Sequence, residues 1–92
     1  MTSSAEGNAV EARKIFDALK ACGISKAEIS LRLDVSTYII ERVGIKSKTL
    51  REQIFSNIVT RLRIWYASGG DEFRTIFQYH AKARGIPARW YE

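Results

Sequence analysis

The sequence predicts an all-α fold, a small single-domain bundle of about five helices. Apolar side chains recur every three or four residues along most of the chain, the period of a helix that buries one face. Glycine or proline interrupts this pattern between segments, and no stretch alternates as a strand would. The 92 residues, 46% of them hydrophobic, are enough for one core, so residues 1–92 are expected to form one domain.

Residues 1–7 are small and polar, and we expect a flexible start there. The spacing then predicts a helix over residues 8–21, ended by Gly23. We expect the single cysteine, Cys22, to be a small buried apolar residue. The inward face of the helix is predicted to carry Ala12, Ile15, Phe16 and Leu19. The face in water is predicted to carry Arg13, Lys14, Asp17 and Lys20.

Two short helices joined by a tight turn are predicted within residues 25–43. Ser25 precedes Glu28 by three residues, the spacing of a capping box. Asp34 stands at the turn, and aspartate tolerates a left-handed backbone. Ser36 can cap the second helix. The apolar residues expected to face inward are Ile29, Leu33, Val35, Ile40 and Val43.

This stretch resembles the helix-turn-helix of the lambda-repressor-like family, the Cro and repressor type. The family pattern wants a small residue in the first helix, here Ser30, and a turn residue four positions later, where Asp34 replaces the usual glycine. It then wants aliphatic residues at the positions of Ile40 and Val43. The resemblance implies a transcriptional regulator of phage, plasmid or mobile-element type that binds double-stranded DNA. Operator symmetry and a small core both favour a homodimer, with the C-terminal helix or the Trp90–Tyr91 tail at its interface. The alternative is a plain helical hairpin in a bundle.

In a helix-turn-helix, the start of the second helix enters the major groove. Helical position would turn Thr37, Tyr38, Glu41 and Arg42 toward the bases, with Ser36 near a phosphate. Arg42 can donate two hydrogen bonds to guanine, Glu41 can accept one from cytosine, and Thr37 or Ile39 can touch a thymine methyl. The resemblance implies contacts with the DNA phosphate backbone for four residues: Lys26, Lys46, Ser47 and Lys48. A solvated helix face or loop is the alternative for these polar groups, and a place at the rim of the core is the alternative for Tyr38.

Two further helices are predicted after the basic loop. Thr49 with Glu52 forms a second capping box, which would open the longest helix over residues 50–66. Asp71 is expected to cap a helix to about Arg84, with an apolar face of Phe73, Ile76, Phe77 and His80. Gly85 and Pro87 end it and leave a tail over residues 85–92, in which Trp90 and Tyr91 either complete the core or form an interface.

The net charge of the chain favours one class of function over another. Fifteen Lys and Arg against ten Asp and Glu give +5, and the excess begins after residue 24. A basic balance suits a polyanionic partner such as DNA. A second class is a module that binds and inhibits a host protein through the aromatic tail. Salt dependence separates the two, because phosphate contacts release counterions.

Catalysis is not expected. His80, the only histidine, has no serine, cysteine or paired carboxylate at a recognisable spacing. Metal-ligand spacing and a phosphate-binding loop are also missing from the sequence, so no cofactor is expected. We expect no membrane span and no signal peptide, and therefore a cytoplasmic protein.

Overall fold

A computed structural model describes residues 4–46 and 49–92, and there the chain forms five α-helices and a short 3₁₀ segment. In order, they are α1 (Ser4–Ala21), α2 (Lys26–Leu33), α3 (Thr37–Arg42), α4 (Glu52–Ser68), α5 (Asp71–Ala83) and η1 (Ala88–Trp90). No strand occurs in those residues. The all-α prediction is therefore confirmed.

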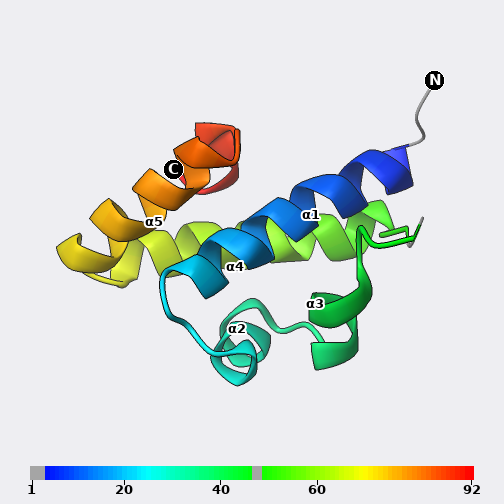
Figure 1. Cartoon of the computed structure of the whole chain (residues 1–92), viewed down its shortest axis with the longest axis horizontal. Coiled ribbons are helices and arrows are strands. Elements are labelled where there is room, and N and C mark those ends of the chain that lie inside the picture. Colours follow the sequence, from blue (N-terminus) through cyan, green and yellow to red (C-terminus); the bar gives the residue numbers. More distant parts are fainter. Residues whose placement is uncertain (1–3, 47–48) are drawn as a thin grey trace.

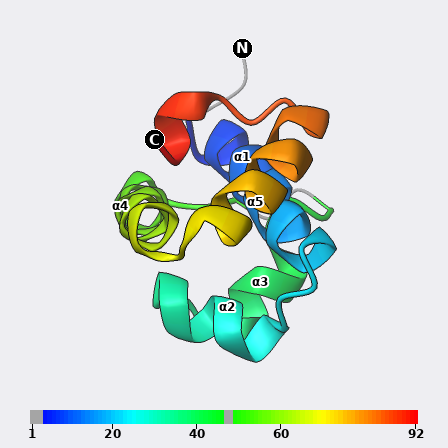
Figure 2. The same ribbon diagram turned by 90° about the vertical axis from the view of Figure 1, so that its left-hand side faces the viewer.

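The longest helices, α1 and α4, lie side by side along the long axis of the molecule (Figure 1). The α2–α3 pair lies on one side of them, and η1 lies on the other (Figure 2). The core fills the space between these elements. Its largest fully buried side chains include Phe16, Ile29, Leu62, Phe77 and Tyr91.

The first helix is longer than its pattern predicts. It begins at Ser4, so residues 4–7 are helical rather than a flexible start, and residues 1–3 lie outside the described part. Cys22, just after this helix, is only partly buried, and burial raises the pKa of its thiol. It packs against the core as a partly buried residue, so the predicted burial of Cys22 is only partial.

The predicted caps of α4 and α5 are wrong. The helix α4 begins at Glu52, and its N-cap residue, Arg51, makes no side-chain capping bond. Leu50 precedes the helix but is buried, and its N–H donates to the Ala5 carbonyl oxygen at 3.1 Å. That bond joins the loop to α1. Thr49 is therefore not the N-cap residue of α4, and the expected capping box does not open the helix. At α5 the N-cap is Gly70, because Asp71 is already the first helical residue.

The C-terminal tail belongs to the core. Tyr91 is 1% exposed, with its ring centroid 5.2 Å from that of Phe77. Trp90 is half-buried, and its ring meets Phe55 edge-on at 5.1 Å. These contacts favour the core alternative over an interface for both residues. One predicted core residue of α5, Ile76, is instead 38% exposed.

Side-chain hydrogen bonds cap the N-termini of both α2 and α3. The backbone N–H of Glu28 donates to Ser25 Oγ at 3.2 Å, and that of Ile39 donates to Ser36 Oγ at 3.3 Å. Between them, Asp34 is left-handed with φ 52° and ψ 50°. The two helices, both serine caps and the turn are thus confirmed, whereas a DNA-binding role for the pair stays a prediction.

Arg13 of α1 holds the C-terminus of α3. The sequence pattern predicts that this side chain faces water, and that prediction is wrong. Arg13 Nε donates to the Val43 carbonyl oxygen at 3.0 Å, and a terminal nitrogen of the same guanidinium donates to the Ile40 carbonyl oxygen. These carbonyls belong to the last turn of a helix, where no intrahelical donor remains. The Arg13 side chain is 17% exposed and also pairs with Asp17 at 3.3 Å.

The residue after this contact has no room for a side chain. Gly44 has φ +75°, and a Cβ there would lie 2.8 Å from the Ala9 carbonyl oxygen and 2.8 Å from Arg13 Cβ. Glycine therefore lets the chain that leaves α3 pass directly against α1.

We predict that Gly44→Ala destabilises the fold far more than Gly23→Ala. Both glycines have positive φ, but a Cβ at Gly23 meets nothing within 4 Å. Gly23→Ala should lower the free energy of unfolding by about 1–2 kcal/mol, the cost of a left-handed alanine. Gly44→Ala should lower it by about 1–3 kcal/mol more, because α1 must move. Urea unfolding of both variants measures this difference, and equal losses would contradict the close approach.

Asp34→Gly should change the free energy of unfolding by less than about 1 kcal/mol. Glycine relieves the left-handed strain. The substitution also removes an exposed ion pair, Asp34 Oδ2 to Arg61 at 3.5 Å, whose contribution should be small. Thermal melts compare Asp34→Gly with Arg61→Gln, which removes the ion pair alone. A loss above about 1 kcal/mol from Asp34→Gly alone would mean that the aspartate stabilises the turn in another way.

Candidate nucleic-acid interface

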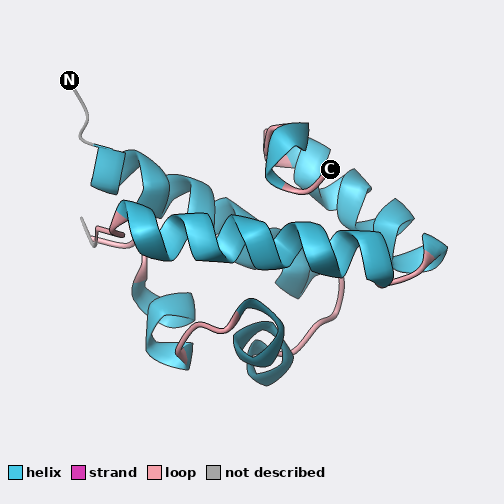
Figure 3. Ribbon diagram, turned by 180° about the vertical axis from the view of Figure 1, so that it is seen from behind, coloured by secondary structure: helices cyan, strands magenta, loops and turns pink. Residues whose placement is uncertain are grey.

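One face of α3 is exposed and carries the residues predicted to read bases: Thr37, Tyr38, Glu41 and Arg42. The opposite face is anchored, since Ile40 is 0% and Val43 3% exposed. Ile39 is half-buried and packs against the core, so its predicted contact with a thymine methyl is not supported. No other element covers the outer side of the α2–α3 pair within residues 4–46 and 49–92 (Figure 3).

The structure joins two predicted site residues to each other. Lys26 Nζ, at the start of α2, forms an ion pair and hydrogen bond with Glu41 Oε1 on α3. The Lys26 ammonium holds the pKa of the Glu41 carboxyl below its usual range, with smaller contributions from Arg42 and Lys20. The ion pair therefore favours the charged form of Glu41, which can accept hydrogen bonds. Lys26 thus bridges α2 to α3, and its predicted contact with the DNA backbone stays a prediction.

Arg42 and Tyr38 also form a pair. The guanidinium carbon of Arg42 lies 4.9 Å from the centroid of the Tyr38 ring, within the range of a cation–π contact. Tyr38 is 57% exposed, so it is not at the rim of the core. Ser36 uses its hydroxyl oxygen as the cap of α3, which leaves its hydroxyl proton free to donate elsewhere.

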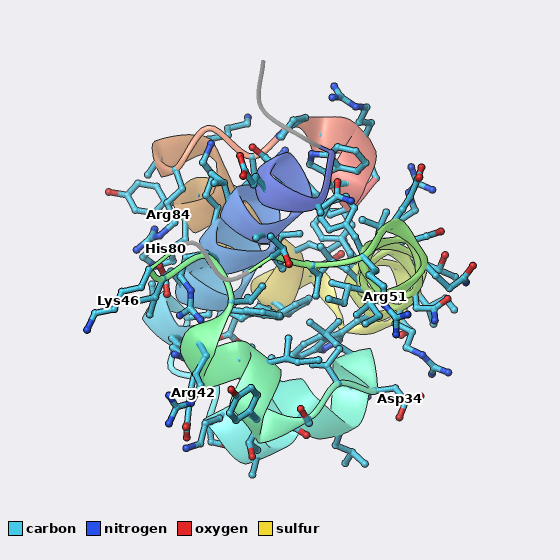
Figure 4. All side chains as sticks on the ribbon, turned by 90° about the vertical axis from the view of Figure 1, so that its right-hand side faces the viewer. Asp34, Arg42, Lys46, Arg51, His80 and Arg84 are labelled. Atoms are coloured by element: carbon cyan, nitrogen blue, oxygen red, sulfur yellow. The ribbon has the colours of Figure 1, made fainter. Side chains whose placement is uncertain are left out.

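A surface hollow of about 320 Å³ lies beside α3 and is lined by Glu41, Arg42, Ile45 and Lys46. Arg42 and Lys46 point to the same side of the molecule, whereas Asp34 and Arg51 point to the other (Figure 4). The hollow therefore combines a carboxylate, two cations and one aliphatic side chain. Ser47 and Lys48, the other predicted loop contacts, lie outside the described residues.

Two members of this surface were not predicted. Ile45 is 45% exposed in the hollow. An aliphatic residue inside an otherwise basic loop was the signal that could have identified it. Lys20, exposed in the last turn of α1, acts on the Glu41 carboxyl. No local pattern indicates this proximity, because it depends on how α1 packs near α3.

The described residues contain no group of three or more His, Cys, Asp or Glu that could hold a metal ion. The His80 ring meets Tyr79 edge-on, with centroids 5.1 Å apart. None of the helices within residues 4–46 and 49–92 is both long and apolar enough to cross a membrane. No family model, curated protein or solved structure matches this chain.

Proposed function

We propose that this protein is a sequence-specific DNA-binding regulator of transcription that inserts α3 into the major groove. The observation that carries the proposal is the outer face of α3, where four exposed side chains stand beside Lys46 of the following loop. A helix with its side chains is about 10–12 Å wide, and the major groove is about 12 Å wide. A short, anchored helix with an open outer face suits that groove.

The side chains on this face offer different chemistry to base edges. Arg42 can donate two parallel hydrogen bonds to guanine after leaving the Tyr38 ring. Glu41, held by Lys26, can accept from the amino group of cytosine. Thr37 can touch a thymine methyl or donate a hydrogen bond. The preferred site therefore contains guanine and cytosine within the few base pairs that α3 spans.

Phosphate contacts follow from the cations around α3. Lys46 lies in the hollow next to Arg42 and can reach the DNA backbone when α3 enters the groove. Such contacts add affinity and salt dependence but no sequence preference.

A homodimer is part of the proposal, with α5 as its contact. Ile76 and Tyr79 lie three residues apart on one face of α5 and are 38% and 72% exposed. Acidic residues Asp71 and Glu72 open this helix, and basic residues Lys82 and Arg84 lie at its end. Two copies of α5 packed antiparallel would place each acidic end beside a basic end. An isologous contact of this kind suits a symmetric operator.

The alternative function, inhibition of a host protein through the aromatic tail, loses its main support. It requires Trp90 and Tyr91 to be free for a partner, but Tyr91 is 1% exposed and Trp90 packs on Phe55. A partner would first have to remove these rings from the core.

The two kinds of contact should respond differently to mutation. Arg42→Ala should lose about 1–3 kcal/mol of binding free energy on the cognate duplex and relax the preference at one base pair. Lys46→Ala should weaken cognate and scrambled duplexes alike and lower the salt slope by about one unit. Fluorescence anisotropy at two salt concentrations, beginning with the DNA upstream of the gene, measures both effects.

Arg51→Ala is the matched control, because it removes the same charge from an exposed arginine on the other side of the molecule (Figure 4). It should leave both affinities nearly unchanged. If Arg42→Ala lost the same binding free energy on both duplexes, Arg42 would contact only the DNA backbone. Other residues would then have to read the bases. A wild-type protein that binds no duplex at low salt would refute the proposed function.

Sedimentation equilibrium at micromolar concentration should show a dimer that Tyr79→Lys weakens. A lysine at Tyr79 would place a desolvated charge in the contact between the two α5 helices. Ile64→Lys is the control, because Ile64 is also apolar and is 63% exposed, but on α4. A strictly monomeric wild type would contradict the dimer, and dissociation by Ile64→Lys alone would move the contact to α4.

A further inference from the structure

One aliphatic side chain lies among the charged groups of the hollow beside α3. The hollow has a volume of about 320 Å³ and four lining residues: Glu41, Arg42, Ile45 and Lys46. Ile45 is 45% exposed, and among the four its side chain alone has no polar group. A single exposed aliphatic residue is ordinary on a protein surface, so its role depends on what occupies the hollow.

Ile45 is held at a defined place relative to Arg42. Its backbone N–H donates to the Arg42 carbonyl oxygen at 3.2 Å, so the two residues belong to the same turn. The segment between them is fixed to α1, because Arg13 Nε donates to the Val43 carbonyl oxygen and Gly44 passes directly against that helix. A DNA duplex that Arg42 contacts therefore has the Ile45 side chain beside it.

The chemistry of the major groove limits what Ile45 can contact there. The base edges in this groove present hydrogen-bond donors and acceptors, and the one apolar group among them is the 5-methyl group of thymine. The donors and acceptors suit the charged members of the hollow, since Arg42 can donate to guanine and Glu41 can accept from cytosine. Lys46 suits a phosphate. A methyl group is the base-edge partner that remains for Ile45.

We propose that Ile45 contacts the 5-methyl group of a pyrimidine, so that the protein prefers a methyl-bearing pyrimidine close to the guanine that Arg42 reads. This inference rests on the proposed function, because it requires α3 in the major groove. Successive base pairs are about 3.4 Å apart, so side chains of one turn reach bases about one or two pairs apart. Thymine and 5-methylcytosine both carry such a methyl group.

Deoxyuridine tests the contact, because it differs from thymidine only by the missing methyl group. The starting duplex is the tightest binder selected from random sequences, and each thymine in it is replaced in turn. One replacement should weaken binding of the wild-type protein about fourfold, the loss expected for one buried methyl group. Arg42→Ala, which should relax the preference at one base pair, identifies the guanine. The sensitive thymine should lie within the same few base pairs.

Ile45→Ala should remove this sensitivity. The variant should bind the thymine and deoxyuridine duplexes equally well. Ile64→Ala makes the same change at an exposed isoleucine on α4 and should keep the difference between the duplexes. Thr37→Ser is the second control, because Thr37 also carries a methyl group on the exposed face of α3. It too should keep the difference at the position that Ile45 contacts.

Two further duplexes distinguish the two sources of the methyl group. They carry a C·G pair in place of the sensitive T·A pair, with the cytosine either plain or 5-methylated. If 5-methylcytosine is bound more tightly than thymine, the natural source is methylated DNA. If it is bound less tightly than thymine but more tightly than cytosine, the source is thymine. Equal binding of cytosine and 5-methylcytosine would contradict a methyl contact.

The results that would overturn this inference differ from the result that would refute the proposed function. If the wild type binds the selected duplex but no deoxyuridine replacement weakens binding, α3 reads DNA without a methyl contact. If Ile45→Ala keeps the full sensitivity, or Thr37→Ser removes it, another residue makes the contact. A wild type that binds no duplex at low salt would overturn both.

Discussion

The position of α3 depends on one side chain, Arg13 of α1. A helix of six residues is too short to persist alone, so neighbouring elements must hold both of its ends. Ser36 satisfies an amide at its start, and the Arg13 guanidinium satisfies carbonyls at its end while placing a positive charge near the negative pole of the helix. Gly44 then lets the chain leave along α1. The exposed face of α3 follows from these constraints.

The parts of the fold that sequence reasoning predicted are those set by near neighbours. Ser25, Asp34 and Ser36 act within five residues of their own positions, so their types and spacing indicate both caps and the turn. Arg13 and Leu50 were misjudged because their partners, Val43 and Ala5, lie far away in the sequence. Helical periodicity assigns a polar residue to water. It has no way to show that a long side chain will meet the open end of another helix.

The candidate site likewise has features that the sequence predicts and features that depend on distant partners. Periodicity alone predicts which side chains of α3 face outward, and all four are exposed. It does not predict how they pair, because the Lys26–Glu41 bridge joins two helices and the proximity of Lys20 to Glu41 depends on tertiary packing. The aromatic tail was ambiguous for a related reason: η1 is too short to show which of its sides is apolar. The positions of Phe55, Tyr66 and Phe77 decide where its rings lie.

The contact between Arg13 and the end of α3 also has an evolutionary consequence. A backbone oxygen of Ala9 closes the space beside Gly44, so no change of a neighbouring side chain alone would make room for a larger residue at that position. Arg13 can be replaced only by another long donor that reaches the same carbonyls. Among relatives of this chain, glycine should therefore be invariant at position 44 and arginine strongly favoured at position 13. Together with the left-handed residue at position 34, these two form a widely spaced signature that is more selective than the permissive pattern of residues 25–43.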